Sequence, residues 1–187
     1  MFDTPTRNKV QPLVERIAKG LAERGLSANH LTLFGFAIGV GACVSVAVGQ
    51  WWLGLALWIA NRVVDGFDGA VARIVGPTEF GGFLDIMADF AVYAGIVVAI
   101  GIAEPSARVA ALVTLLAYYL NGSSFLAFSS LAERLKLGGS DGRSLIFPTG
   151  LAEGSETILA IIIVLAFRAH AATILCCLLY TSDAADE

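Results

Sequence analysis

Four aspartates set between two strongly apolar segments constrain this chain more than any other feature. They are Asp65, Asp68, Asp85 and Asp89. The first two are three residues apart and the last two are four apart, so each pair shares one face of a helix. The Gly-Pro-Thr run at 76–78 between the pairs is typical of a turn. The sequence therefore predicts two helices, a tight connection, and two carboxylate pairs that converge.

Carboxylates in a membrane-embedded helix are costly and usually face a cavity or a partner. Arg73 lies close by in the sequence, but one arginine cannot neutralise four acids. A hard divalent cation bound through oxygen ligands is the natural counter-charge. The pattern alone leaves one alternative open, in which the aspartates are solvated helix ends at the membrane surface. A cation site is the interpretation that the spacing favours.

The spacing is more specific than a set of four acids. The positions that carry it are Asp65, Asp68, Gly69, Ala72, Arg73, Gly81, Asp85 and Asp89. This order resembles the signature of the CDP-alcohol phosphotransferase family, D-x2-D-G-x2-A-R-x8-G-x3-D-x3-D. The connection between Arg73 and Gly81 is one residue shorter here, which puts the local loop geometry in question more than the chemistry.

The resemblance implies a role for each matching residue. Asp65, Asp68 and Asp85 would bind the metal, Mg²⁺ or Mn²⁺, and Asp89 would be the general base and a further ligand. The CDP moiety would contact Asp65, Gly69, Ala72 and Arg73. The reaction would be attack of an alcohol on the lipid-side phosphorus of CDP-diacylglycerol or a similar CDP-alcohol, with release of CMP. Family members have six membrane spans behind an N-terminal interfacial helix and are typically dimeric.

The residue types fit that chemistry. Phosphoryl transfer needs charge neutralised on the phosphate, acidic residues to hold the metal, and a base for the acceptor proton. Gly69 and Ala72 remove side-chain bulk beside the acids, and Gly81 does the same on the facing helix. A nucleotide can then lie close to both helices, and Arg73 can pair with its diphosphate.

Composition indicates a membrane protein. Of the 187 residues 57% are hydrophobic, and the mean hydropathy is +0.75, which points to a polytopic chain. The expected fold is an all-α membrane helix bundle in a single domain, residues 1–176. Apolar runs predict about six spans, the last one truncated: near 31–49, 51–73, 80–103, 107–135, 151–167 and from 171 onward.

Residues 8–25 place apolar side chains at helical spacing, with charged residues on the other side. This predicts an amphipathic helix at the membrane interface. A soluble helix packed on other protein is the alternative. The three cysteines, Cys43, Cys176 and Cys177, lie in apolar runs and form no metal-ligand or disulfide pattern.

Residues 177–187, CLLYTSDAADE, resemble translated sequencing-adapter read-through, and we expect them to be non-native. Without their three acids, 13 acids stand against 12 bases, and the formal charge changes from −4 to −1. The acidic balance therefore says nothing about partners, and no nucleic-acid partner is expected.

Basic residues are unevenly placed along the predicted spans. One side would hold Arg7, Lys9, Arg16, Lys19, Arg24, Arg73, Arg134, Lys136 and Arg143, and the other only Arg108 and Arg168. The positive-inside rule then puts the aspartates at the cytoplasmic face of a membrane, which we expect to be the inner or plasma membrane of a prokaryote.

The acceptor stays open. A phosphorylated alcohol would need basic residues, for which Arg62, Arg134, Lys136 and Arg143 are candidates. A cationic or zwitterionic alcohol would need acids, for which Glu153 and Glu156 are candidates. Two other function classes remain: a cation transporter, since intramembrane carboxylates also mark ion pathways, and a non-catalytic, truncated relative of the family. Against transport, the acids cluster at one end of the predicted spans.

Overall fold

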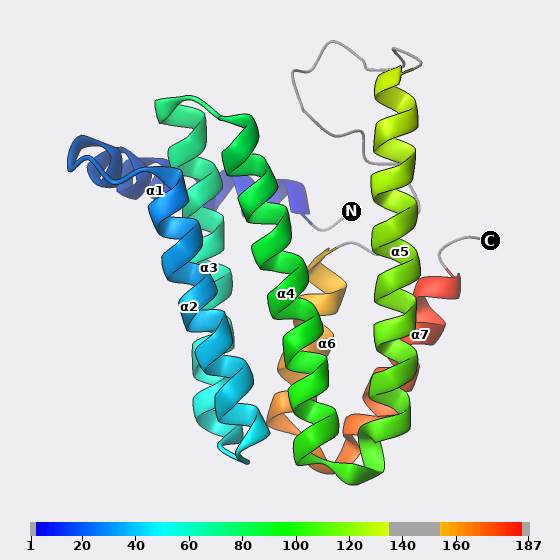
Figure 1. Ribbon diagram of the computed structural model, residues 1–187. Coiled ribbons are helices and arrows are strands. Elements are labelled where there is room, and N and C mark those ends of the chain that lie inside the picture. Colours follow the sequence, from blue (N-terminus) through cyan, green and yellow to red (C-terminus); the bar gives the residue numbers. More distant parts are fainter. Residues whose placement is uncertain (1–2, 135–153, 185–187) are drawn as a thin grey trace. The chain divides into compact units, whose positions relative to one another are not determined.

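The protein is helical throughout the part of the chain that the structure describes. The computed structural model describes residues 3–134 and 154–184 (Figure 1). The elements are α1 (Asp3–Glu23), α2 (Ala28–Ala47), α3 (Trp51–Val75), α4 (Glu79–Ala103), the short 3₁₀ helix η1 (Pro105–Ala107), α5 (Arg108–Arg134), α6 (Gly154–Ala166), the 3₁₀ helix η2 (Arg168–His170) and α7 (Ala171–Ala184). The prediction of an all-α fold is confirmed.

The chain forms two compact units, Met1–Ile96 and Val97–Glu187, and α4 contributes residues to both. The first unit contains all four aspartates of the predicted site. Whether the chain behaves as one domain stays a prediction. So does the non-native origin of residues 177–187, into which α7 continues.

In the first unit α2 and α3 are joined by a short turn and pack along each other. Ser27 caps the start of α2, since its hydroxyl accepts a hydrogen bond from the backbone N–H of His30 at 3.4 Å. A glycine allows α4 to approach α2 closely, because a Cβ on Gly39 would lie 2.5 Å from Cγ2 of Val92. These contacts bring three helices together at the level of the aspartates.

Helix α1 is the predicted amphipathic helix, although it begins at Asp3 rather than at residue 8. Figure 1 shows it running crosswise to α2 and α3. Ala18 is fully buried and packs with Ala70 and Val71 of α3, one turn beyond Asp68. Arg16 and Lys19 on the other side are exposed. The helix therefore stabilises the end of α3 that carries the acids.

The connection between α3 and α4 is the turn predicted from the Gly-Pro-Thr run. Gly76 has φ of +108°, a backbone conformation that L side chains rarely adopt, so glycine ends α3 there. The Thr78 hydroxyl accepts a hydrogen bond from the backbone N–H of Gly81 at 3.0 Å and so caps the start of α4. The connection between α3 and α4 is one residue shorter than in the family signature, and it still ends one helix and caps the next.

In the second unit α4 ends at Ala103, and Glu104 caps η1 by accepting a hydrogen bond from the backbone N–H of Ser106. Helix α7 packs against α5 and α6. Ile161, Leu165 and Leu175 supply large buried side chains to this unit. Helix α6 and the segment that begins at Arg168 are bent by 117° to each other.

Within residues 3–134 and 154–184, three helical segments are long and apolar enough to cross a membrane: Ala28–Ala47, Glu79–Ala103 and Pro105–Leu131. The bent pair Thr157–Ala166 and Arg168–Cys177 would make a fourth if it counts as one span. Helix α3 is long enough, but Arg62, Asp65 and Asp68 interrupt its apolar run. The predicted count of about six spans therefore stays a prediction.

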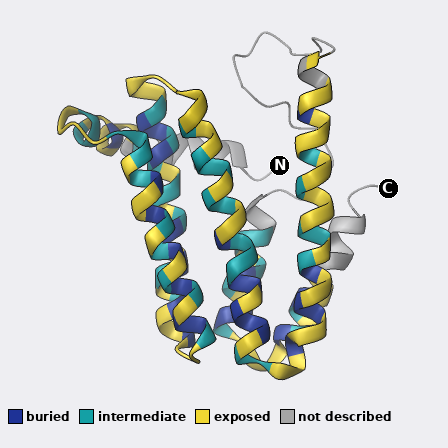
Figure 2. Ribbon diagram, viewed as in Figure 1, coloured by how far each residue is buried: buried dark blue, intermediate teal, exposed yellow. Residues whose placement is uncertain are grey.

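Figure 2 shows exposed positions in yellow along these helices. Many of them carry large apolar side chains. On α2, for example, Phe34 is 60% exposed and Val44 is 57% exposed. Water would disfavour so much exposed apolar surface, whereas lipid tails are a good solvent for it. The burial pattern thus agrees with a membrane protein.

Candidate metal and substrate site

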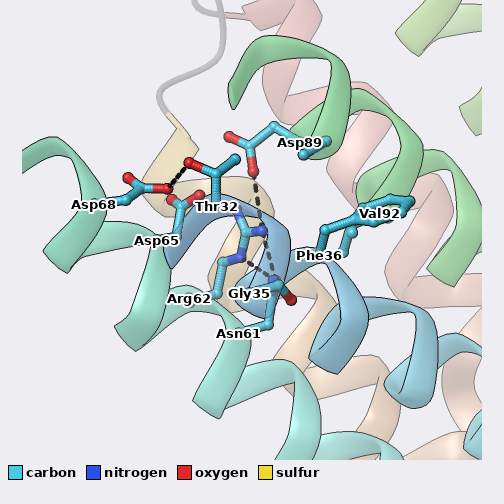
Figure 3. Close-up of a pocket in the computed structure, with 10 residues that line it drawn as sticks. Thr32, Gly35, Phe36, Asn61, Arg62, Asp65, Asp68, Asp89 and Val92 are labelled. Atoms are coloured by element: carbon cyan, nitrogen blue, oxygen red, sulfur yellow. Dashed lines mark hydrogen bonds and ion pairs between the residues drawn. The ribbon is translucent and has the colours of Figure 1, made fainter. Parts of the chain in front are cut away.

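A pocket in the first unit opens between α2, α3 and α4, and Figure 3 shows its lining. Helix α2 contributes a hydroxyl and small or apolar groups, whereas α3 and α4 contribute the charges. The lining residues are Thr32, Gly35, Phe36, Asn61, Arg62, Asp65, Asp68, Ala88, Asp89 and Val92. Three of the four predicted aspartates therefore line one pocket.

Asp85 joins two of these acids in a cluster. Single carboxylate oxygens of Asp65, Asp68 and Asp85 all lie within 4.8 Å of one another. Oxygens on opposite sides of a six-coordinate Mg²⁺ are about 4 Å apart, so the three groups are close to liganding distance. Hard oxygen donors from two helices suit Mg²⁺ or Mn²⁺. The residues that the sequence predicts as metal ligands thus fit such an ion.

Asp68 is the most enclosed of the three, at 5% exposure. Its Oδ2 accepts a hydrogen bond of 2.8 Å from the hydroxyl of Thr32, itself 6% exposed. A charge-assisted bond of this kind fixes the carboxylate while leaving its other oxygen for a further partner. Thr32 was not predicted; in the sequence it is one hydroxyl in an apolar run, a common feature of membrane helices.

Asp89 lies on the same side of α4 as Asp85 but is not part of the three-carboxylate cluster. Its Oδ1 accepts a hydrogen bond of 3.0 Å from Nη2 of Arg62. Arg62 also lies 3.7 Å, through Nη1, from Oδ2 of Asp65. The structure thus brings Asp89 into the pocket, and its roles as base and as fourth ligand stay predictions.

The predicted nucleotide-contacting residues follow on α3. A Cβ on Gly69 would meet only Nη1 of Arg73, at 3.6 Å, which is ordinary contact. The space beside Gly69 is therefore open, and its predicted part in nucleotide binding stays a prediction. Ala72 is half-buried, and Arg73 is exposed in the last turn of the helix.

Gly81 has a packing reason for its lack of a side chain. A Cβ there would lie 2.9 Å from Oδ1 of Asn29 on α2 and 2.9 Å from Oγ1 of Thr78. The close approach of α2 and α4 accounts for the glycine without a ligand. Its predicted part in nucleotide binding stays a prediction.

Most of the side chains that the sequence suggests for acceptor binding are not among those that the structure describes. Lys136, Arg143 and Glu153 lie outside the described residues, and so does the side chain of Glu156. Arg134 is the last residue of α5, in the second unit. Only Arg62 is placed in the pocket, and its hydrogen bonds are with Asn61 and Asp89.

Comparison with known proteins identifies the family of the chain. The family model described as CDP-alcohol phosphatidyltransferase matches residues 26–182. The inner membrane protein YnjF of Escherichia coli K12 is 39% identical over 166 residues, which are 87% of this chain and 81% of that protein. Archaetidylinositol phosphate synthase of Pyrococcus horikoshii is 32% identical over 164 residues, with the same two shares.

Solved structures show the same fold. Phosphatidylinositol phosphate synthase of Mycobacterium tuberculosis, crystallised with CDP-DAG bound, aligns with a TM-score of 0.67 at 20% identity and covers 94% of this chain and 90% of that one. Its complex with manganese and citrate aligns with a TM-score of 0.63 at 19% identity, covering 90% and 85%. With an all-helical fold, a carboxylate cluster at the signature positions and a family match over most of its length, this chain belongs to the CDP-alcohol phosphatidyltransferase family.

Proposed function

We propose that this protein transfers a phosphatidyl or similar substituted phosphate group from CDP-diacylglycerol, or a related CDP-alcohol, to an alcohol, and releases CMP. The observation that supports this most is the cluster of Asp65, Asp68 and Asp85. Two of its members, Asp65 and Asp68, line one pocket together with Asp89. The family membership is the second support. The transfer belongs to phospholipid biosynthesis.

In the reaction one phosphorus atom gains one P–O bond and loses another. The acceptor hydroxyl loses its proton to Asp89, its oxygen forms a bond to the lipid-side phosphorus, and the bond from that phosphorus to the bridging oxygen breaks. CMP leaves with the electron pair. Asp89 is suited to the base role because Arg62 binds only its Oδ1, and Oδ2 is not used by that bond.

Asp65, Asp68 and Asp85 would hold Mg²⁺ or Mn²⁺. A divalent cation supplies neutralisation of the charge on the diphosphate and on the leaving group. Thr32 would keep the Asp68 carboxylate in place throughout, since its hydrogen bond engages only Oδ2. Gly69 and Ala72 would leave room for the cytidine nucleotide, and Arg73 would pair with its phosphates.

The setting of the reaction follows the same proposal. The protein is integral to the membrane, as its exposed apolar helices and its similarity to an inner membrane protein indicate. We place the aspartates at the cytoplasmic face, where a soluble acceptor meets a lipid substrate entering from the side, and we expect a homodimer. Basic residues concentrated on the aspartate side support this orientation.

A CMP-release assay tests the proposal. Purified protein in detergent receives CDP-diacylglycerol, Mg²⁺ and a panel of alcohols that includes inositol phosphate, because several relatives are named as inositol phosphate lipid synthases. CMP release with one acceptor, lost in Asp89→Asn, is the expected result. Folded protein that releases no CMP with any acceptor would contradict the proposal, and ion flux in vesicles would then test transport.

A further inference from the structure

Arg62 is a buried cation of the pocket, and the chemistry above draws only on its hydrogen bond to Oδ1 of Asp89. Its side chain is only 9% exposed. Two of its three nitrogens are engaged by neighbouring side chains. Nε and Nη2 donate to Oδ1 of Asn61 at 2.9 and 2.6 Å, and Nη2 also donates to Oδ1 of Asp89 at 3.0 Å. The guanidinium therefore links α3 directly to the carboxylate on α4 (Figure 3).

Asn61 anchors this guanidinium to the third helix of the pocket. It is 3% exposed, and its Nδ2 donates a hydrogen bond of 2.8 Å to the backbone carbonyl of Gly35 on α2. Asn61 thus connects the backbone of α2 to Arg62, and Arg62 connects Asn61 to Asp89 on α4. A planar guanidinium suits this task because its donors are fixed relative to one another.

Two aromatic rings hold the guanidinium from its other sides. Its Cζ lies 5.2 Å from the ring centre of Trp58 and 4.6 Å from that of Tyr93. The two rings meet edge to face at 5.3 Å and 84°, and Trp58 is fully buried. Such contacts stabilise a cation and restrict its movement. Arg62 is therefore held by packing as well as by hydrogen bonds.

We propose that Arg62 is a positioning residue that fixes the carboxylate of Asp89, holding its Oδ1 apart from the three-carboxylate cluster and leaving Oδ2 for the acceptor proton. This rests on the proposed function. It differs from the sequence-based prediction that Arg62 binds a phosphorylated acceptor, since its Nε and Nη2 already donate to Asn61 and Asp89. Only Nη1 remains less occupied, 3.7 Å from Asp65.

Steady-state kinetics separate the two roles. In Arg62→Lys the charge remains but the rigid fork is lost, so kcat should fall about 10- to 100-fold, the order of loss that a misplaced catalytic group causes, while the acceptor KM changes less than about twofold. An acceptor KM that rises about tenfold at unchanged kcat would overturn the proposal in favour of acceptor binding. Unchanged kcat and KM would overturn it as well.

Mn²⁺ affinity, measured by electron paramagnetic resonance without substrate, tests the pairing independently of activity. Arg62→Gln removes a positive charge and releases Asp89, so the protein should bind Mn²⁺ more tightly. This gain in Mn²⁺ affinity should be at least about threefold smaller when Arg62→Gln is made in the Asp89→Asn variant, because Arg62 and Asp89 act on each other. An equal gain in both backgrounds would refute the coupling, and lost binding with a lowered unfolding temperature would show a purely structural role. These measurements remain decisive even if the wild-type protein releases no CMP.

Discussion

The hydrogen bond between Thr32 and Asp68 leads to a prediction about stability that is separate from catalysis. Thr32→Val replaces the hydroxyl with a methyl group of nearly the same volume. The Asp68 carboxylate then loses its side-chain donor, and the carbonyl of Ala28 loses a weaker bond of 3.1 Å from the same hydroxyl. Both side chains remain at about one-twentieth exposure, 6% and 5% in the present protein. A valine causes little steric change at this position, so the lost hydrogen bond is the main effect.

The magnitude follows from the geometry. The bond is short, at 2.8 Å, and its acceptor is a carboxylate, so it belongs to the class that contributes about 1.5–3 kcal/mol to stability. For a chain of this size each kcal/mol shifts the unfolding midpoint by about 2–4 °C. Thr32→Val should therefore lower the midpoint by about 3–12 °C.

The assay is thermal unfolding in detergent followed by circular dichroism, with EDTA present so that no cation replaces the lost donor. Thr114→Val is the matched control. Thr114 is fully buried, but its hydroxyl donates only to the backbone carbonyl of Ala110, four residues earlier in its own helix. Removing that bond leaves no charged group without a donor, so the midpoint should change by less than half as much.

Thr32→Ser is the second control, because it keeps the hydroxyl and loses only a methyl group. It should recover most of the stability that Thr32→Val loses. The reasoning is refuted if Thr32→Val and Thr114→Val lower the midpoint equally, or if Thr32→Val has no effect. Either result would mean that the Asp68 carboxylate finds another partner of the same strength.

Three further predictions concern the ligand site. Gly69→Ala should preserve the unfolding temperature but raise the KM for CDP-diacylglycerol about tenfold, because the added methyl group would take space that the proposed function assigns to the nucleotide. Gly66→Ala on the same helix, also sterically open, should change neither. Asp85→Asn should weaken Mn²⁺ binding, measured by titration, at least about tenfold, and unaltered binding would exclude this residue as a ligand. Gly81→Ala should destabilise the protein by about 1–3 kcal/mol, and Asn29→Ala should restore part of that loss in the same unfolding assay.

Much of the site could be predicted because it depends on spacing along single helices. The intervals between Asp65 and Asp68 and between Asp85 and Asp89 put each pair on one face, and the Gly-Pro-Thr run turns one helix back on the other. Local geometry is therefore enough to bring Asp65, Asp68 and Asp85 together. The transmembrane character likewise follows from composition.

The contributions of α2 could not be predicted in the same way. The bonds from Thr32 to Asp68 and from Asn61 to the Gly35 carbonyl join residues 36 and 26 positions apart. Such pairings depend on how the helices lie side by side, which residue periodicity does not specify. A hydroxyl or an amide in an apolar run has many candidate partners, and the sequence does not choose among them.

Asp89 and Gly81 show a related limit. The signature predicts Asp89 as the general base and a further ligand, and in the structure its Oδ1 accepts a hydrogen bond from Arg62, outside the cluster of the other three aspartates. The predicted role of Gly81 in nucleotide binding stays a prediction, and the structure adds a packing reason for the glycine, since a Cβ there would meet Asn29 and Thr78. A motif specifies which residues occur, and packing decides which atoms each of them meets.

The division of the chain at Ile96 bears on how the protein is made. Every residue that lines the pocket, from Thr32 to Val92, belongs to the first unit. During translation these residues are synthesised before any residue of the second unit. The nascent chain thus holds a complete set of carboxylates, with Arg62 as their buried counter-charge, before the second unit exists. When these helices enter the membrane, the charge of the carboxylates must therefore be balanced by residues of the first unit and by any cation that the carboxylates bind.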